Sequence, residues 1–287
     1  MITAPEPAVQ PRGEVDRVAR LSPREFAARY LRPGRPVLLT GMMDEWPAMR
    51  RWSFQSLARL NAECQVCLEE GNVIQGETAL RHVKLGEFLN ALASGAAAAP
   101  GRVPYLSLFD IFTVLPQLVN DVDFSLLRRH TVLNRVFAWL GPAGTVSGFH
   151  QDWMDNVLAQ VLGRKRVLLA APDQSPMLYP SEKYEYRCTL ASVDPDSWDP
   201  ARHPRFARAR LHEVVLHPGE MLFIPRGWWH RVQSLDASIS VNNFGHRLRH
   251  LLLSQPVWWA RDVLHERGMY GRACTCHMIV DGRRVSR

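Results

Sequence analysis

The sequence predicts a mainly β protein with flanking helices, and three features of the chain support this fold class. Apolar runs of strand length follow one another from Val103 to Phe244, with almost no helical patterning between them. Turn signals such as Gly141-Pro142 and His217-Pro218-Gly219 separate these runs. Helical patterns lie before and after this region. Many short strands divided by turns predict a closed or sandwiched β architecture.

The region before the strands is predicted from helix caps, apolar runs and breakers. Residues 1–20 begin with several prolines and are expected to form a flexible arm. Ser22-Pro23-Arg24-Glu25 combines a capping box with proline at the first helical position, which predicts a helix to about Leu31. Residues 21–104 are expected to pack on the core through the strands Val37–Thr40 and Cys64–Glu69, the helices Phe54–Leu60 and Leu85–Ala93, and a mobile loop Ser94–Gly101.

The β domain is expected to cover residues 105–245. Within it, residues 172–210 form a long insert rich in proline, aspartate and arginine, which predicts a lid or recognition surface. Two helices are expected within residues 246–270, followed by a mobile tail, residues 271–287, with Cys274-Thr-Cys276-His277. The predicted strands are Val103–Leu108, Val132–Leu140, Thr145–Gln151, Val157–Leu162, Arg166–Ala170, Glu213–Leu216, Met221–Ile224, His230–Ser234 and Ser238–Phe244.

Composition indicates a globular protein, which we expect in the cytoplasm. Of the 287 residues, 46% are hydrophobic and 22% charged, and no apolar run reaches the length of a membrane span. The N-terminus lacks the pattern of a secretory signal. The five cysteines are irregularly spaced, which argues against a disulfide framework. The net charge of +7 leaves an anionic or nucleic-acid partner open, although the arginines are spread along the chain.

Two histidines and one carboxylate form the most informative chemical pattern. His150 and Asp152 end the segment Gly144-Thr-Val-Ser-Gly-Phe-His-Gln-Asp152, and His230 ends Phe223-Ile-Pro-Arg-Gly-Trp-Trp-His230. Side chains at i and i+2 of a strand share a face, so His150 and Asp152 can hold one ion, with the third ligand from another strand. This set matches the facial triad of non-haem Fe(II) oxygenases. Taken alone, a buried hydrogen-bonded pair would explain His150 and Asp152 equally well.

Further blocks give the chain a resemblance to a known family. From about residue 20 to 245 it resembles the Jumonji-C (JmjC) oxygenases of the cupin superfamily. It is most similar to the small hydroxylases such as the asparaginyl hydroxylase that inhibits the hypoxia-inducible factor. The resemblance implies a double-stranded β-helix, or jelly roll, that binds Fe(II) and 2-oxoglutarate and uses O₂. The matching blocks are the Gly144–Asp152 segment, Asn156-Val-Leu-Ala-Gln-Val-Leu-Gly-Arg-Lys-Arg166, Leu216-His-Pro-Gly-Glu-Met-Leu-Phe-Ile-Pro-Arg-Gly-Trp-Trp-His230 and Ile239-Ser-Val-Asn242.

The resemblance also implies roles for individual residues. His150, Asp152 and His230 match the iron ligands, and no other catalytic side chain is required. Lys165 matches the lysine that pairs with the far carboxylate of 2-oxoglutarate, where a surface lysine would be the ordinary alternative. For Tyr105, Asn156 and Asn242, a polar group hydrogen-bonded within the core is a close alternative. The further cofactor-binding positions are Tyr105, Ser147, Asn156 and Asn242.

The chain departs from the family pattern beside the metal motif. Gly148-Phe149 and Trp153-Met154-Asp155 are unusual there, and they flank the expected entrance of the site. Trp153 and Asp155 are therefore the candidate substrate contacts.

The expected function is an Fe(II)- and 2-oxoglutarate-dependent dioxygenase that hydroxylates an unactivated C–H bond, forming succinate and CO₂. A protein or peptide side chain is the leading substrate. The alternatives are a modified tRNA base, an amino acid or peptide natural product, N-methyl-lysine demethylation, and a non-catalytic cupin-fold binding protein. The intact triad argues against the last of these. A homodimer through the C-terminal helices is a further expectation, from their apolar residues and from hydroxylases of the family that pair in this way.

Overall fold

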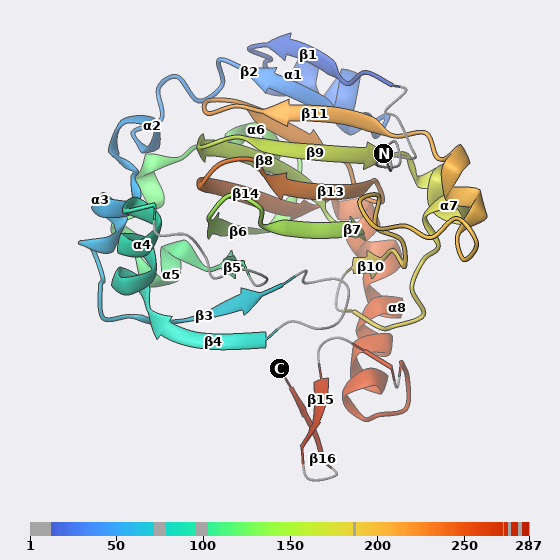
Figure 1. Cartoon of the computed structure of the whole chain (residues 1–287). Helices are drawn as coiled ribbons and strands as arrows, with labels where there is room; N and C mark the ends of the chain where they lie inside the picture. Colours follow the sequence, from blue (N-terminus) through green and yellow to red (C-terminus); the bar gives the residue numbers. More distant parts are fainter. Residues whose placement is uncertain are drawn as a thin grey trace, which may run out of the picture.

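Two β-sheets face each other in the computed structural model, which describes residues 13–71, 79–95, 103–185, 188–271, 273–274, 277–280 and 283–286 (Figure 1). The larger sheet has nine strands, in the order β1 (Asp16–Ala19), β2 (Val37–Thr40), β12 (Met221–Ile224), β8 (Asp155–Leu162), β14 (Ser238–His246), β6 (Val132–Gly141), β5 (Pro104–Phe109), β3 (Gln65–Glu70) and β4 (Ala79–Lys84). The smaller sheet has five, in the order β10 (Cys188–Leu190), β7 (Val146–Asp152), β13 (Trp229–Ser234), β9 (Lys165–Ala170) and β11 (His212–Leu216).

The chain passes back and forth between the two sheets. Strands β6, β8, β12 and β14 lie in the larger sheet, while β7, β9, β11 and β13 lie in the smaller one. Neighbouring strands of this core are antiparallel. This connectivity makes a jelly roll, the double-stranded β-helix, and confirms the predicted fold class.

Short helices surround the sheets, and the capping box at Ser22 forms as predicted. The Ser22 hydroxyl accepts a hydrogen bond from the Glu25 N–H, and the Glu25 carboxylate accepts one from the Ser22 N–H at 3.0 Å. The helices are α1 (Pro23–Phe26), η1 (Ala27–Leu31), α2 (Ala48–Arg51), α3 (Phe54–Ala58), α4 (Leu85–Ala93), α5 (Ile111–Val114), η2 (Pro116–Asp121), α6 (Ser125–Arg128), η3 (Pro172–Gln174), α7 (Ser175–Leu178), η4 (Pro204–Arg208) and α8 (Leu248–Glu266).

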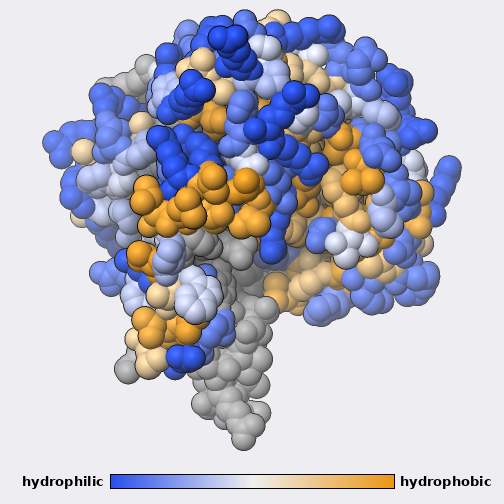
Figure 2. Space-filling model, turned by 180° about the vertical axis from the view of Figure 1, so that it is seen from behind, coloured by the Kyte–Doolittle hydropathy of each residue, from blue (hydrophilic) through white to orange (hydrophobic). Residues whose placement is uncertain are grey.

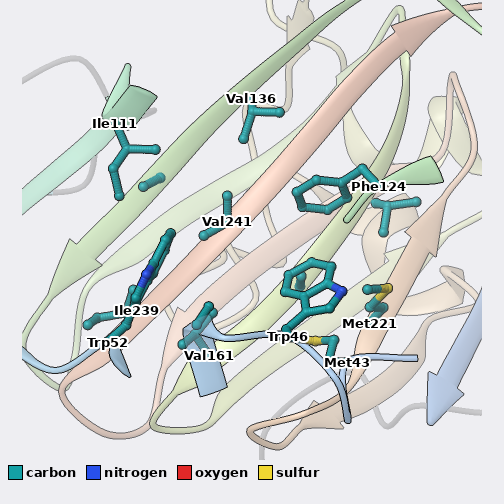
Figure 3. Packing of buried hydrophobic residues seen from close by; sticks show 14 of the residues in the cluster. Met43, Trp46, Trp52, Ile111, Phe124, Val136, Val161, Met221, Ile239 and Val241 are labelled. Atoms are coloured by element: carbon teal, nitrogen blue, oxygen red, sulfur yellow. The ribbon is translucent and has the colours of Figure 1, made fainter. Parts of the chain in front are cut away.

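A large apolar cluster covers the outer face of the larger sheet (Figure 3). Val161 and Val241 project from the sheet strands, and Trp46, Trp52 and Phe124 pack onto them from outside. The alternation of side chains along a strand sends one set to this cluster and the other set into the space between the sheets. The apolar cluster therefore holds rigid the strands whose opposite faces line the inter-sheet space.

The N-terminal prediction needs one correction. Residues 13–20 are not an arm: Asp16–Ala19 forms strand β1, which pairs in parallel with β2. Its side chains are mostly exposed, so backbone pairing and polar contacts hold it, including a hydrogen bond from the Tyr30 hydroxyl to Asp16. A four-residue strand with one partly buried apolar side chain, Val18, gives no clear period-two signal in the sequence. Residues 1–12 lie outside the described part of the chain, as do residues 96–101 of the predicted Ser94–Gly101 loop.

The C-terminal prediction needs two corrections. The two expected helices are one continuous helix, α8, which runs through Pro256. The proline removes one backbone donor without ending the helix. The expected mobile tail contains an antiparallel hairpin of β15 (His277–Val280) and β16 (Arg283–Ser286), drawn projecting away from the sheets in Figure 1. Cys276 lies outside the described residues. None of the described helices is both long and apolar enough to cross a membrane.

The region predicted to have almost no helical patterning contains three short helices between β5 and β6, namely α5, η2 and α6, besides those in the insert. Segments this short do not complete a helical hydrophobic period, so pattern analysis misses them.

The insert 172–210 is a packed cover for the outer face of the smaller sheet. Phe206 and Leu178 from the insert pack with Phe149 and Trp229 from β7 and β13. Its strand β10 extends the smaller sheet beside β7, where Leu190 pairs with His150. The insert is therefore attached to the strand that carries two of the candidate metal ligands.

Removing the Phe206 side chain should loosen this cover. Phe206 is fully buried and packs edge-on against Trp198, so we expect Phe206→Ala to lower the free energy of unfolding by about 3–5 kcal/mol. Urea denaturation followed by circular dichroism measures this loss. The exposed neighbour Arg202 offers the control, because Arg202→Ala should change stability by less than about 0.5 kcal/mol. Equal stabilities for the two variants would show that the insert does not depend on its apolar cluster.

Candidate metal centre

The two histidines and the aspartate of the sequence motif meet in the inter-sheet space. Antiparallel pairing of β7 with β13 places His230 directly opposite His150. The Asp152 carboxylate lies 3.9 Å from His150 Nε2 and 3.5 Å from His230 Nε2. One ligand atom from each residue lies within 4.8 Å of the others, the one such cluster among the described residues. The predicted triad is therefore assembled around a single point.

Backbone carbonyls fix the orientation of both imidazole rings. His150 Nδ1 lies 2.8 Å from the Gly148 carbonyl oxygen, and His230 Nδ1 lies 3.0 Å from that of Trp228. A nitrogen that faces a carbonyl must carry the proton, which leaves Nε2 of each neutral ring with a free lone pair. Both Nε2 atoms lie on the Asp152 side of the rings, so each can bind a cation there.

The pKa values of His150 and Asp152 favour the binding of a cation at neutral pH. Burial, and then the neighbouring His230, lowers the pKa of His150 to about 4, so this ring is neutral. Burial alone would raise the pKa of the Asp152 carboxyl, but His150 and His230 together bring it below its usual value. Two imidazoles and one carboxylate are donors suited to Fe(II), with positions left for further ligands. The residues therefore fit the implied metal.

Lys165 lies on β9 at the inner end of the same space and is 1% exposed. Its ammonium donates hydrogen bonds to the Ser240 hydroxyl at 2.7 Å and the Tyr105 hydroxyl at 3.2 Å. No carboxylate in the described part of the chain pairs with it. Burial lowers its pKa to about 7. A buried ammonium held only by hydroxyl groups fits a site for an anionic ligand, as 2-oxoglutarate requires.

The remaining predicted cofactor residues surround Lys165 and the triad. The Ser147 hydroxyl hydrogen-bonds to Tyr105, whose pKa burial raises above its usual value. The Asn242 side-chain amide donates to Asn156 Oδ1 at 3.3 Å, while Asn242 Oδ1 is buried with no hydrogen-bond partner among the described residues. The structure thus brings all five predicted cofactor positions to one cavity. That cavity measures about 360 Å³ including its open mouth.

The structure separates the two candidate substrate contacts. Asp155 is buried, and its carboxylate forms an ion pair with Arg247 at 2.8 Å and accepts a hydrogen bond from the Arg226 N–H at 3.0 Å. Adjacent residues of a strand face opposite ways, so Asn156 enters the cavity and Asp155 leaves it. The prediction that Asp155 contacts substrate is corrected: it holds Arg247 and the Arg226 turn. Trp153 is partly exposed and packs at a tilt against Trp258 of α8.

Several cavity residues were missed in the sequence. Ser240 is the closest partner of the Lys165 ammonium, and Trp139, Leu158, Val232 and Phe244 also line the cavity. Strand periodicity could have found most of them, because Leu158, Val232 and Ser240 lie two residues from Asn156, His230 and Asn242. Tyr105 is held close to β6, where a Cβ at Gly141 would meet its ring at 2.8 Å.

Comparison with known proteins finds a matching family model and several similar proteins. Residues 23–247 match a family model described as a cupin-like domain. A protein of Xenopus tropicalis named lysine-specific demethylase 8 is 35% identical over 222 residues, or 76% of this chain and 49% of that protein. Jumonji C domain-containing protein 5 of Drosophila melanogaster is 32% identical over 254 residues, or 84% of this chain and 63% of that protein.

A human protein named HSPB1-associated protein 1 is 31% identical over 233 residues, or 73% of this chain and 47% of that protein. The chain thus spans less than two thirds of the length of each of these relatives. The family match ends at residue 247, so helix α8 lies beyond it.

Proposed function

The chain belongs to the cupin-like family of JmjC oxygenases, and on this premise we propose that it is an Fe(II)- and 2-oxoglutarate-dependent dioxygenase that hydroxylates a C–H bond of a protein or peptide side chain. The single observation that supports this most strongly is the Lys165 ammonium, buried without a carboxylate partner among the described residues, in the same cavity as His150, Asp152 and His230. A metal site and an anion site in one cavity fit a dicarboxylate that reaches from one to the other.

Each group of residues has a distinct part in the proposed reaction. His150, Asp152 and His230 would hold Fe(II), and Lys165, with Tyr105 and Ser240, would hold the far carboxylate of 2-oxoglutarate. With the iron and 2-oxoglutarate bound, O₂ supplies the oxidation of a substrate C–H bond, with release of succinate and CO₂.

The other cavity residues shape this site. Asn156 and Asn242 present amide groups to the space between the two anchors, where Asn242 Oδ1 still needs a donor. Phe244, Trp139, Leu158 and Val232 line the cavity with apolar surface, which limits access of bulk water. The ligands His150 and Asp152 keep 18% and 16% of their side-chain surface exposed, so a substrate can approach the metal from the mouth.

Demethylation uses the same metal centre and is the alternative outcome, because three relatives are named lysine-specific demethylases. Succinate formation that depends on added Fe(II) and 2-oxoglutarate tests the reaction class. Mass spectrometry of a peptide library treated with the enzyme then separates the outcomes: hydroxylation adds 16 Da to a peptide, and demethylation removes 14 Da. Protein that binds neither Fe(II) nor 2-oxoglutarate would overturn the whole proposal.

We also propose that two copies associate through α8. Leu252, Leu253 and Trp259 are 67%, 77% and 66% exposed. All the positions described as exposed between Leu252 and Leu264 are apolar. Seen from behind, a band of hydrophobic side chains crosses the side of the molecule where α8 runs (Figure 2). An uncharged apolar face has no feature that selects a charged partner, and it can pair with its own copy about a two-fold axis.

The assembly prediction concerns mass in solution. We expect light scattering after gel filtration to give twice the 32.7 kDa chain mass, and the double variant Leu253→Glu/Trp259→Glu to give the monomer mass. Leu133 on β6 is 66% exposed and serves as the control, because Leu133→Glu should leave the dimer intact. A wild-type monomer at micromolar concentration would contradict this assembly.

A further inference from the structure

A second cavity lies beside the mouth of the metal site, between α8 and the strand ends that carry the ligands. It measures about 380 Å³ and is lined by Trp153, Arg226, His246, His250, Ser254, Trp258 and Asp262. Trp153 follows the metal-site residue Asp152 directly. The Gly227 N–H donates to the Asp152 carbonyl oxygen at 2.8 Å, which ties the Arg226 turn to the same strand end. A chain that enters the metal site therefore passes close to this cavity.

The cavity contains a guanidinium group without a carboxylate partner. Arg226 is partly buried, and its side chain contacts only the Ser254 hydroxyl, at 3.3 Å, in the hydrogen bonds and ion pairs of the described residues. The Asp155 carboxylate lies close enough to affect Arg226, but its ion pair is with Arg247. The Asp155 carboxylate is thus used by Arg247, and the Arg226 guanidinium keeps hydrogen-bond donors unused toward the cavity.

Neighbouring arginine side chains also affect His250. Burial, followed by the charges of Arg247, Arg226 and Arg249, lowers the pKa of His250 to about 4. Its ring is therefore neutral and can donate one hydrogen bond, and its Nδ1 is buried with no hydrogen-bond partner among the residues described. Asp262, on the α8 wall, accepts a hydrogen bond from the Tyr184 hydroxyl. Arg226 and His250 thus leave donor capacity unused beside an aromatic wall of Trp153 and Trp258.

We propose that this cavity binds an acidic side chain of the polypeptide substrate, with its carboxylate on Arg226 and its methylene groups against Trp153. This inference rests on the proposed hydroxylase function and adds a substrate class to it: a polypeptide with aspartate or glutamate near the oxidised residue. A guanidinium binds a carboxylate through two parallel hydrogen bonds, and the partly buried setting strengthens that pair relative to one in water.

The unused donors of Arg226 favour a carboxylate over the other candidate groups. A methylated lysine carries a positive charge, which Arg226 repels, while the Asp262 carboxylate that could attract it already accepts the Tyr184 hydroxyl. A nucleic acid binds through many exposed basic residues along its backbone, whereas this site offers one partly buried arginine.

The test follows the indole N–H signals of Trp153 and Trp258 by NMR in full-length protein labelled with ¹⁵N-tryptophan. The probe is the capped peptide acetyl-Gly-Gly-Glu-Gly-Gly-amide, with the glutamine peptide of the same length as its match. We expect the glutamate peptide to shift both signals in a saturable way, and the glutamine peptide to bind at least tenfold more weakly. Trp153→Phe and Trp258→Phe assign the two signals.

Arg226→Gln should weaken binding of the glutamate peptide at least tenfold, while Arg226→Lys should recover part of it. The hydrogen bond from Arg226 to Asp155 uses the backbone N–H, so both substitutions retain it. Arg164→Gln, at an exposed arginine paired with Asp236, is the control and should bind as the wild type does. Equal binding of the glutamate and glutamine peptides would overturn the inference, and so would a mixed-sequence single-stranded RNA that shifts the signals at lower concentration than the glutamate peptide.

Succinate formation by the wild type, measured in parallel, separates this inference from the proposed function. Iron-dependent succinate with no response to the glutamate peptide overturns the acidic-substrate site alone. No binding of Fe(II) or 2-oxoglutarate overturns the oxygenase function, and with it the substrate class inferred here.

Discussion

Asp152→Ala is expected to abolish iron-dependent succinate formation. Asp152 supplies the one negative charge of the triad, and its carboxylate lies within 4 Å of both histidine Nε2 atoms. Loss of a group that only orients a metal ligand costs about 10–100-fold in affinity or activity, so loss of the charged ligand itself should cost more. Anaerobic titration with Fe(II), and with Mn(II) as a redox-stable substitute, measures the metal affinity directly.

The neighbouring residue on the same strand gives a matched control. Gln151 points to the opposite face of β7, so Gln151→Ala should keep both metal affinity and succinate formation near the wild-type level. Thermal unfolding of Asp152→Ala without metal checks that the fold survives. A variant that still forms succinate at more than a tenth of the wild-type rate would show that the iron is held elsewhere.

The strands of the core were predictable because each has an apolar stretch bounded by turn residues. Met221–Ile224 and the runs that became β6, β8 and β14 match the structure within a residue or two at most ends. What the sequence did not predict depends on contacts that leave no period in the chain. Strand β1 is held by its backbone, and β10 by the edge of the smaller sheet. The single helix α8 forms despite a proline that usually marks a boundary.

The residues of the candidate site also fall into those that the sequence predicted and those that it missed or misassigned. His150 and Asp152 were found from their spacing on one strand, because a metal site needs particular residue types at fixed positions, whereas Lys165 was found from the family resemblance. Ser240 escaped notice because a serine in a strand is common, although it shares a strand face with Asn242, and its hydroxyl lies 2.7 Å from the Lys165 ammonium. Asp155 was misassigned for a related reason. Its place beside the motif suggested the entrance, but strand alternation turns it toward Arg247.

Lys165→Met should have two opposite effects, because this lysine is buried without a carboxylate partner among the described residues. Its pKa in the folded chain is lowered by burial to about 7, while the unfolded chain keeps the usual value near 10.5. Between these values the unfolded state binds more protons, so the free energy of unfolding rises with pH from about 7 to 10.5. The methionine variant should remove that slope and be more stable than the wild type at pH 7.

The same change should weaken 2-oxoglutarate binding by about 10²–10³-fold, because it leaves a buried carboxylate unpaired, which costs about 2–5 kcal/mol.

In the wild type only the charged lysine binds the carboxylate. Affinity should therefore fall as pH rises above about 7, approaching tenfold per pH unit, and be nearly constant below it. Calorimetry on Mn(II)-loaded protein from pH 6 to 9 measures this profile. Lys165→Arg keeps its charge throughout the range, so its weaker binding should not vary with pH. A wild-type affinity that is flat from pH 6 to 9 would show that Lys165 is not the anchor, or that it stays charged despite its burial.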